Sequence, residues 1–153
     1  MHQLVEGRKL VLCGVEIPYH LGLLGHSDAD VATHAIMDAV LTSIGERDIG
    51  ERDIGVHFPD NDDSYKGISS LVLLQKVAEL VKNKNAKLQS VSCVIMAQAP
   101  KLAQYIPQMA SNIASILNLP TNRVNISATT TEKLGIIGEG KGIAAQAVCL
   151  TLM

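Results

Sequence analysis

The chain has 153 residues, close to the commonest size of a single domain, so one hydrophobic core can organise it. Hydrophobic residues make up 47% of the chain and aromatic residues only 3%, which excludes disorder and predicts a core of Val, Ile, Leu and Ala. The formal net charge of -2 excludes a broad basic surface for nucleic acid, so we expect a small anionic ligand held by a few local groups.

The three cysteines, Cys13, Cys93 and Cys149, lie in apolar runs without C-x-x-C spacing, so we expect reduced side chains in the core. The sequence opens without a charged leader and apolar run, and no window approaches the roughly 20 apolar residues of a membrane span. We therefore expect a cytoplasmic protein with no membrane partner, or a plastid stroma protein if a transit peptide was removed.

Residues 9–13 and 15–18 are short β-like runs on either side of Gly14, and together they predict an early hairpin. The next stretch, GHSDADVATH over residues 25–34, places two histidines and two aspartates at a loop-to-helix junction. Ser27 or Asp28 can cap a helix over about residues 30–44, whose apolar residues recur at helical spacing. This stretch by itself indicates either a ligand site or a capped surface helix with one incidental histidine.

The five residues ERDIG occur twice in succession, at residues 46–50 and 51–55. The copy is too short for a solenoid repeat, so it is either a lengthened surface loop or a duplication introduced into the sequence. The acidic, turn-rich residues 57–63 follow and indicate an ordered loop.

The second half of the chain alternates helices and strands. A second helix is expected over residues 71–81 with Ser69 or Ser70 as its cap, and a third helix takes Pro107 into its first turn. Residues 90–98, 124–128 and 143–153 are typical of strands, and the glycine-rich residues 138–142 lack Walker spacing and suggest a hairpin. The order ββ-α-β-α-β-β favours an α+β domain, a two-layer α/β sandwich that can turn one sheet face to partner subunits.

Neutral imidazole and carboxylate groups suit Zn²⁺, and a catalytic zinc site needs three protein ligands and one open position. Asp38 lies one helical turn after His34 and can either orient its ring or form an ordinary solvated pair. His20 and His57 lie beside aromatic residues and are expected to be ordinary loop or surface histidines. The candidate metal ligands are His2, His26 and His34.

Two loops that follow strands are candidates for phosphate or base recognition. Residues 129–132 (TTTE) supply three hydroxyls and a carboxylate, although plain strand-edge threonines have the same pattern. Residues 97–101 (AQAPK) offer backbone groups and one cation, as an ordinary strand-to-helix turn also does.

Taken together, the stretches GLLGHSDADVATHAIMDAV, DIGVHFPDND, IMAQAPKL, IPQM and ATTTEKLG resemble the 2-C-methyl-D-erythritol 2,4-cyclodiphosphate synthase family of the non-mevalonate isoprenoid pathway. The resemblance covers residues 1–153 as a single domain. It implies a mixed sheet covered by helices on one face, with the sheets facing each other in a homotrimer that has intersubunit active sites. It also implies conversion of 4-diphosphocytidyl-2-C-methyl-D-erythritol 2-phosphate to the cyclic diphosphate and CMP, with Zn²⁺ at the active site and Mg²⁺ or Mn²⁺ bridging phosphates.

The resemblance assigns roles to residues of this sequence. His2 and His34 match zinc histidines, and His26 and Thr130 match groups that stabilise the transition state. Ser27 falls where a phosphate is held. The other matched positions hold the methylerythritol part (Asp53, Ile54, Gly55, Phe58, Pro59, Asp60, Asn61 and Asp62) or the cytidine diphosphate (Ala97, Gln98, Ala99, Pro100, Lys101, Thr129, Thr131 and Glu132).

Two departures from the family bear on the site. The family's first strand and a metal-binding aspartate two places before His2 have no counterpart, so we expect weak metal binding and low activity if the sequence is the whole molecule. Removing one ERDIG copy restores the family's spacing, which leaves Asp48 or Asp53 as the substrate aspartate. We choose Asp53 because it keeps its link to the FPDND loop.

A third departure concerns the phosphate end of the site. Ile136 and Glu139 stand where the family often has Phe and Arg, although Lys141 can supply a cation. Two interpretations compete with the synthase: a catalytically weakened trimer that binds cytidine or isoprenoid diphosphates without turnover, and a general zinc phosphohydrolase.

Overall fold

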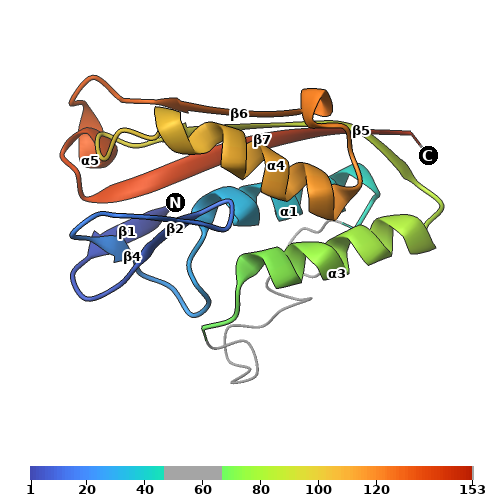
Figure 1. Cartoon of the computed structure of the whole chain (residues 1–153), viewed down its shortest axis with the longest axis horizontal. Helices are drawn as coiled ribbons and strands as arrows, with labels where there is room; N and C mark the ends of the chain where they lie inside the picture. The colour runs from blue at the N-terminus through green and yellow to red at the C-terminus, as the bar shows by residue number, and fades with distance from the viewer. Residues whose placement is uncertain (47–66, 153) are drawn as a thin grey trace.

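A five-stranded sheet forms one layer of the molecule, and helices form the other layer (Figure 1). The structure is a computed structural model, and it describes residues 1–46 and 67–152. The sheet order is β4-β1-β7-β5-β6, where β5 and β6 are parallel and the other pairs are antiparallel. Its strands are β1 (His2–Val5), β4 (Gly22–Leu23), β5 (Lys87–Met96), β6 (Val124–Thr129) and β7 (Gly142–Leu152), while β2 (Leu10–Leu12) and β3 (Val15–Ile17) form a separate hairpin.

The three long helices lie on the same side of the sheet (Figure 1). They are α1 (Val31–Ser43), α3 (Ser70–Asn83) and α4 (Ile106–Leu117), and a short helix, α5 (Gly135–Gly138), precedes β7. The opposite face exposes alternate residues of β7, with Val148 65% and Leu150 58% exposed. The expected α+β architecture, a mixed sheet covered by helices on one face, is therefore confirmed. No helix in the two described ranges is long and apolar enough to cross a membrane.

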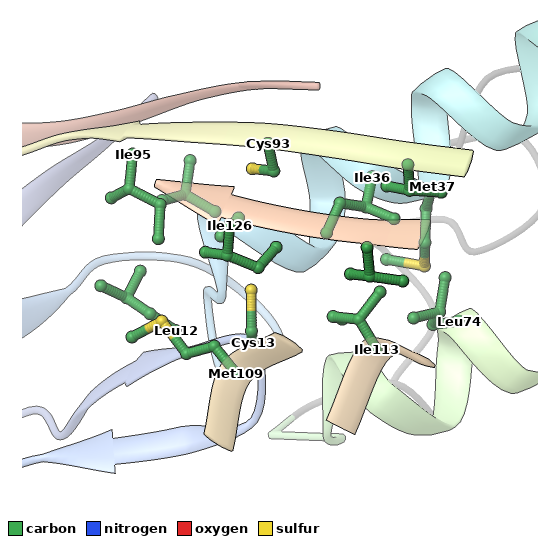
Figure 2. Packing of buried hydrophobic residues seen from close by; sticks show 14 of the residues in the cluster. Leu12, Cys13, Ile36, Met37, Leu74, Cys93, Ile95, Met109, Ile113 and Ile126 are labelled. Carbon is green, nitrogen blue, oxygen red and sulfur yellow. The ribbon is translucent and has the colours of Figure 1, made fainter. Parts of the chain in front are cut away.

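The core lies between the sheet and the helices, and Figure 2 shows its side chains packed between these two layers. Cys13 and Cys93 are buried free thiols, as expected, and Cys149 is half-buried. Burial raises the pKa of Cys93 to about 12, so its thiol stays protonated. The residues labelled in Figure 2 come from six parts of the fold: Leu12 and Cys13 from the hairpin, Ile36 and Met37 from α1, Leu74 from α3, Cys93 and Ile95 from β5, Met109 and Ile113 from α4, and Ile126 from β6.

The early hairpin, the helices and the later strands occur where the sequence predicts them, with small differences at their ends. The hairpin expected over residues 138–142 is wrong, because α5 ends at Gly138 and β7 begins at Gly142. Gly138 closes this turn, and a Cβ there would lie 2.2 Å from the carbonyl carbon of Lys133. The short strands β1 and β4 were not expected, and β1 places the N-terminal residues beside β7.

Candidate active site

The N-terminus of α1 is fixed by Asp30, which is its N-cap residue in place of the expected Ser27 or Asp28. The fully buried carboxylate accepts hydrogen bonds from the backbone N–H groups of Cys13, Gly14 and Thr33 at 2.8 to 2.9 Å, and from Thr33 Oγ1 at 2.7 Å. Burial raises the pKa of Asp30 to about 6, although the hydrogen bonds from Thr33 and Gly14 act in the opposite direction. The role of Asp30 is therefore to hold the start of α1 in place, and we assign it no contact with a ligand.

His34 lies one turn into α1, and its backbone N–H donates to the carbonyl of Asp30 at 3.0 Å. Its ring nitrogen Nε2 lies 2.9 Å from Ser70 Oγ and 3.3 Å from Ser27 Oγ. Ser27 is held by its own neighbours, because its Oγ accepts from the backbone N–H of Ala29 and its carbonyl accepts from Arg8 Nη2. The imidazole of His34 is thus oriented by hydroxyls from two separate segments.

Ser70 begins α3 and joins that helix to the loop before α1. Both its backbone N–H, at 2.9 Å, and its hydroxyl donate to the carboxylate of Asp28. Of the two predicted caps of α3, Ser69 has that role, because its side chain accepts from the backbone N–H of Leu71. The contact of Ser70 with Asp28 was not predicted. The contact between Ser70 and His34 joins residues 36 positions apart, so no local pattern in the sequence could have revealed it.

The two histidines expected to bind zinc are brought together. The ring centroids of His2 and His34 lie 5.8 Å apart at 77°, an edge-on arrangement. His2 is placed by the pairing of β1 with β7, where it lies opposite Ile143. In the two described ranges no cluster of three or more His, Cys, Asp or Glu side chains could hold a metal. The donor set of two imidazoles fits part of a zinc site, which needs a further ligand.

The loops expected to bind cytidine diphosphate also lie side by side, at the carboxyl ends of the parallel strands β5 and β6. The backbone N–H of Ala97 donates to the carbonyl of Thr129 at 3.0 Å, and that of Lys133 donates to Gln98 Oε1 at 3.1 Å. Thr130 Oγ1 donates to Glu132 Oε1 at 3.0 Å. In open α/β sheets, ligands bind beyond the carboxyl ends of parallel strands, so this edge is suited to a ligand.

The histidine pair and the two loops lie at the same end of the sheet. His2 is opposite Ile143 in β7, and the next residue of β7, Ala144, is opposite Met96, which is in turn paired with Thr129. Three strand-to-strand spacings separate His2 from Thr129, which amounts to roughly 14 Å across the sheet, perpendicular to the strands. A cavity of about 860 Å³ lies at the opposite end, beside the C-terminal ends of α3 and α4, and none of the predicted site residues lines it.

The other predicted site residues lie partly inside and partly outside the described ranges. His26 is half-buried, and its carbonyl accepts from the backbone N–H of Gly67 at 2.9 Å. Ala99 and Pro100 are joined by a cis peptide bond, and Lys101 and Thr131 continue the two loops. The candidate aspartates Asp48 and Asp53, together with Ile54, Gly55, Phe58, Pro59, Asp60, Asn61 and Asp62, lie outside the described residues.

Solved structures share this fold. The chain is 39% identical to the bifunctional IspDF from Campylobacter jejuni, with a TM-score of 0.89, over 98% of this chain but only 39% of that longer protein. A structure of 2C-methyl-D-erythritol-2,4-cyclodiphosphate synthase in a CDP-bound form is 36% identical, with a TM-score of 0.86, over 99% of this chain and 95% of that one.

Sequence comparisons give the same family. The YgbB family model matches residues 1–152. Relatives from Clostridium novyi (strain NT) and Geobacillus sp. (strain WCH70) are 54% and 55% identical over 98% of this chain and 92% of their own length, and both are named 2-C-methyl-D-erythritol 2,4-cyclodiphosphate synthase. The chain therefore belongs to the YgbB family, the family of these cyclodiphosphate synthases.

Proposed function

We propose that this chain converts 4-diphosphocytidyl-2-C-methyl-D-erythritol 2-phosphate into 2-C-methyl-D-erythritol 2,4-cyclodiphosphate and CMP. The observation that carries the proposal is the position of the His2–His34 pair at the same end of the sheet as residues 97–101 and 129–132. Relatives 54% and 55% identical over nearly the whole chain carry the name of this synthase, which supports the same reaction.

The reaction is a phosphoryl transfer within one substrate. An oxygen of the 2-phosphate forms a bond to the β-phosphorus, and the bond from that phosphorus to the oxygen shared with the CMP phosphate breaks, so that CMP leaves with the electron pair. Because the transition state is loose, the protein has mainly to position the groups and to neutralise charge. His26 and Thr130 would stabilise the negative charge that develops in the transition state. Ser27 would hold a phosphate of the substrate.

We propose His2 and His34 as zinc ligands. Zn²⁺ held there would supply positive charge that neutralises and polarises the diphosphate, and Mg²⁺ or Mn²⁺ would be a second cation for the substrate phosphates. The contribution of the chain itself is orientation: β7 places His2, and Ser70 and Ser27 fix the ring of His34. These contacts hold the two imidazole rings close to each other, with centroids 5.8 Å apart, before a ligand binds.

The loops at the ends of β5 and β6 are proposed to hold the cytidine diphosphate, as the CDP named with the similar solved structures suggests. Asp53 and the FPDND residues would hold the methylerythritol part. Of the two ERDIG copies, we expect Asp53→Ala to remove turnover and Asp48→Ala to leave most of it, measured as CMP release. The reverse ranking would assign the substrate contact to Asp48.

We further propose a homotrimer, located in the cytoplasm, in which the uncovered sheet faces pack together and the active sites lie between subunits. The apolar side chains of Val94, Val148, Leu150 and Leu152 lie exposed on that face. Replacing Val148 and Leu150 by Lys should give monomers in analytical ultracentrifugation. Val72→Lys, at an exposed apolar position of α3, is the matched control and should leave the assembly unchanged.

Phosphorus NMR of the cytidyl substrate incubated with the chain tests the activity. A cyclic diphosphate product together with CMP supports the synthase. Linear phosphate products would instead indicate a zinc phosphohydrolase, and binding without any product would indicate the catalytically weakened trimer.

A further inference from the structure

The hydrogen bonds around Ser70 have a defined direction. A serine hydroxyl carries one hydrogen, and a carboxylate can only accept. The hydroxyl of Ser70 donates to Asp28 Oδ1, while the backbone N–H of Ser70 donates to Asp28 Oδ2 at 2.9 Å. Since its single hydrogen is used, Ser70 Oγ can only accept from His34 Nε2, which lies 2.9 Å away.

The proton of a neutral His34 ring must therefore lie on Nε2, and the lone pair lies on Nδ1. The second hydroxyl near Nε2, that of Ser27, lies at 3.3 Å and also accepts from the backbone N–H of Ala29. A histidine that binds a metal through one nitrogen usually donates its other ring N–H to a protein acceptor, which fixes its tautomer and orientation.

We propose that Ser70 and Asp28 are positioning residues that hold His34 in its Nε2–H form and thereby present Nδ1 to the metal. The proposal rests on the proposed role of His34 as a zinc ligand. Both residues are held in place, because Ser70 is buried in the first turn of α3 and the backbone N–H of Asp28 donates to the carbonyl of Ile68 at 3.1 Å. The pair links the start of one helix to a ligand on another, so the ring orientation depends on how α3 docks.

Asp28→Asn is the sharpest test, because it reverses the direction of these hydrogen bonds. Two backbone N–H groups donate to the Asp28 carboxylate, that of Ser70 to Oδ2 at 2.9 Å and that of Asp30 to Oδ1 at 3.2 Å. We expect the amide oxygen to keep the shorter bond, from Ser70, which places the NH₂ group against Ser70 Oγ. Ser70 then has to donate to His34 Nε2, so the ring proton should move to Nδ1. In the metal-free chain, ¹⁵N NMR of labelled histidines at a pH of about 8, above the ordinary imidazole pKa of ~6.5, reads the tautomer directly. A His34→Gln variant identifies the His34 signals.

Ser70→Ala tests orientation rather than tautomer, since an isolated imidazole already favours Nε2–H. We expect zinc affinity, measured by competition with a chromophoric chelator, to fall roughly 10–100-fold in Ser70→Ala and in Asp28→Asn. Ser69→Ala is the matched control: it removes the N-cap of the same helix without touching His34, so it should lower stability but keep tautomer and zinc affinity.

The wild-type Nε2–H form, its reversal in Asp28→Asn and the weaker zinc binding of both variants would support the proposal. A wild-type ring protonated on Nδ1, or an unchanged tautomer in a folded Asp28→Asn chain, would overturn it. If Asp28→Asn does not fold, Ser70→Ala decides: zinc affinity equal to that of Ser69→Ala overturns the positioning role. A wild-type chain with the Nε2–H form but no zinc binding would refute the proposed metal role of His34, a result separate from that of the tautomer.

Discussion

The carboxylate of Asp30 lies 2.8 Å from the backbone N–H of Gly14, and this contact joins the β2–β3 turn to the first turn of α1. The conformation of the turn directs the backbone N–H groups of Cys13 and Gly14 toward Asp30, and both residues have positive φ values, 47° and 72°. Glycine adopts such a conformation without strain, and here its N–H reaches a buried carboxylate. The helix that carries His34 is thus anchored at its start by a residue 16 positions away in sequence.

Asp30→Asn should destabilise the fold. Each carboxylate oxygen of Asp30 accepts two hydrogen bonds, from Cys13 and Thr33 N–H at Oδ1 and from Gly14 N–H and Thr33 Oγ1 at Oδ2. An amide has only one acceptor oxygen, so one of these two pairs of donors would face an NH₂ group. A buried donor left without its acceptor costs about 1–3 kcal/mol, and we expect a loss of this size in the free energy of unfolding from urea denaturation. Glu16→Gln, a substitution of the same chemistry on an exposed carboxylate that pairs with Lys9, is the comparison and should cost much less; an equal loss there would show that Asp30 has no special role.

The stability contributed by Asp30 should depend on pH. Its pKa is raised from 3.8 to about 6 in the folded chain, so the folded state binds the proton more tightly than the unfolded state does. This contribution is complete below the unfolded pKa and is lost as the pH rises through the folded pKa. The difference in unfolding free energy between the wild type and Asp30→Asn should therefore decrease from about pH 4 to above pH 6. A constant or increasing difference would contradict the raised pKa.

The sequence was sufficient for the elements that have periodic apolar residues, and its long motifs were sufficient to identify the family. It was insufficient where tertiary pairing decides. β1 and β4 are four and two residues long and exist because β7 and β1 offer partners. The sequence predicted Ser27 or Asp28 as the cap of α1, but Asp30 is the N-cap residue, because the Gly14 turn supplies its carboxylate with donors. The role of Ser70 likewise depends on how α3 docks, which no short-range pattern encodes.

His34→Ala should remove zinc from the chain. Loss of a direct ligand should weaken binding by more than the roughly 10–100-fold that loss of an outer partner causes, and CMP release should fall with it. Equilibrium dialysis with metal analysis measures the zinc content per chain. His20→Ala is the control, because His20 packs edge-on against Tyr19, with ring centroids 4.4 Å apart, and no zinc role is proposed for it. Equal zinc contents in the two variants would exclude His34 as a ligand.

Gly142→Ala should disturb the metal site through the backbone. A Cβ at Gly142 would lie 2.8 Å from the carbonyl oxygen of His2, so β1 must move away from β7. We expect a stability loss of about 1–3 kcal/mol and weaker zinc binding. Gly45→Ala is the control, because its φ of 73° makes alanine costly by about 1 kcal/mol while no atom lies within 4 Å of the added Cβ. If both variants bind zinc equally well, the position of β1 does not control His2.

Thr130→Val should separate catalysis from binding. Valine has nearly the same shape but lacks the hydroxyl, which in the ligand-free chain donates to Glu132 Oε1. If this hydroxyl stabilises the transition state, kcat should fall roughly 10²–10³-fold, the range seen when a single donor to a developing negative charge is removed. CDP affinity, measured by calorimetry, should change little.

Two further variants make the Thr130 result decisive. Thr130→Ser keeps the hydroxyl and should restore most of the turnover. Thr121→Val alters an exposed threonine just before β6, at the end of that strand away from the site, and should have no effect on kcat. A Thr130→Val chain that loses CDP affinity in proportion to kcat would show that the hydroxyl acts by holding the Thr129–Glu132 loop, because Thr130 Oγ1 also accepts from the backbone N–H of Glu132. In that case the developing charge must be stabilised by other groups, of which His26 is the next to test.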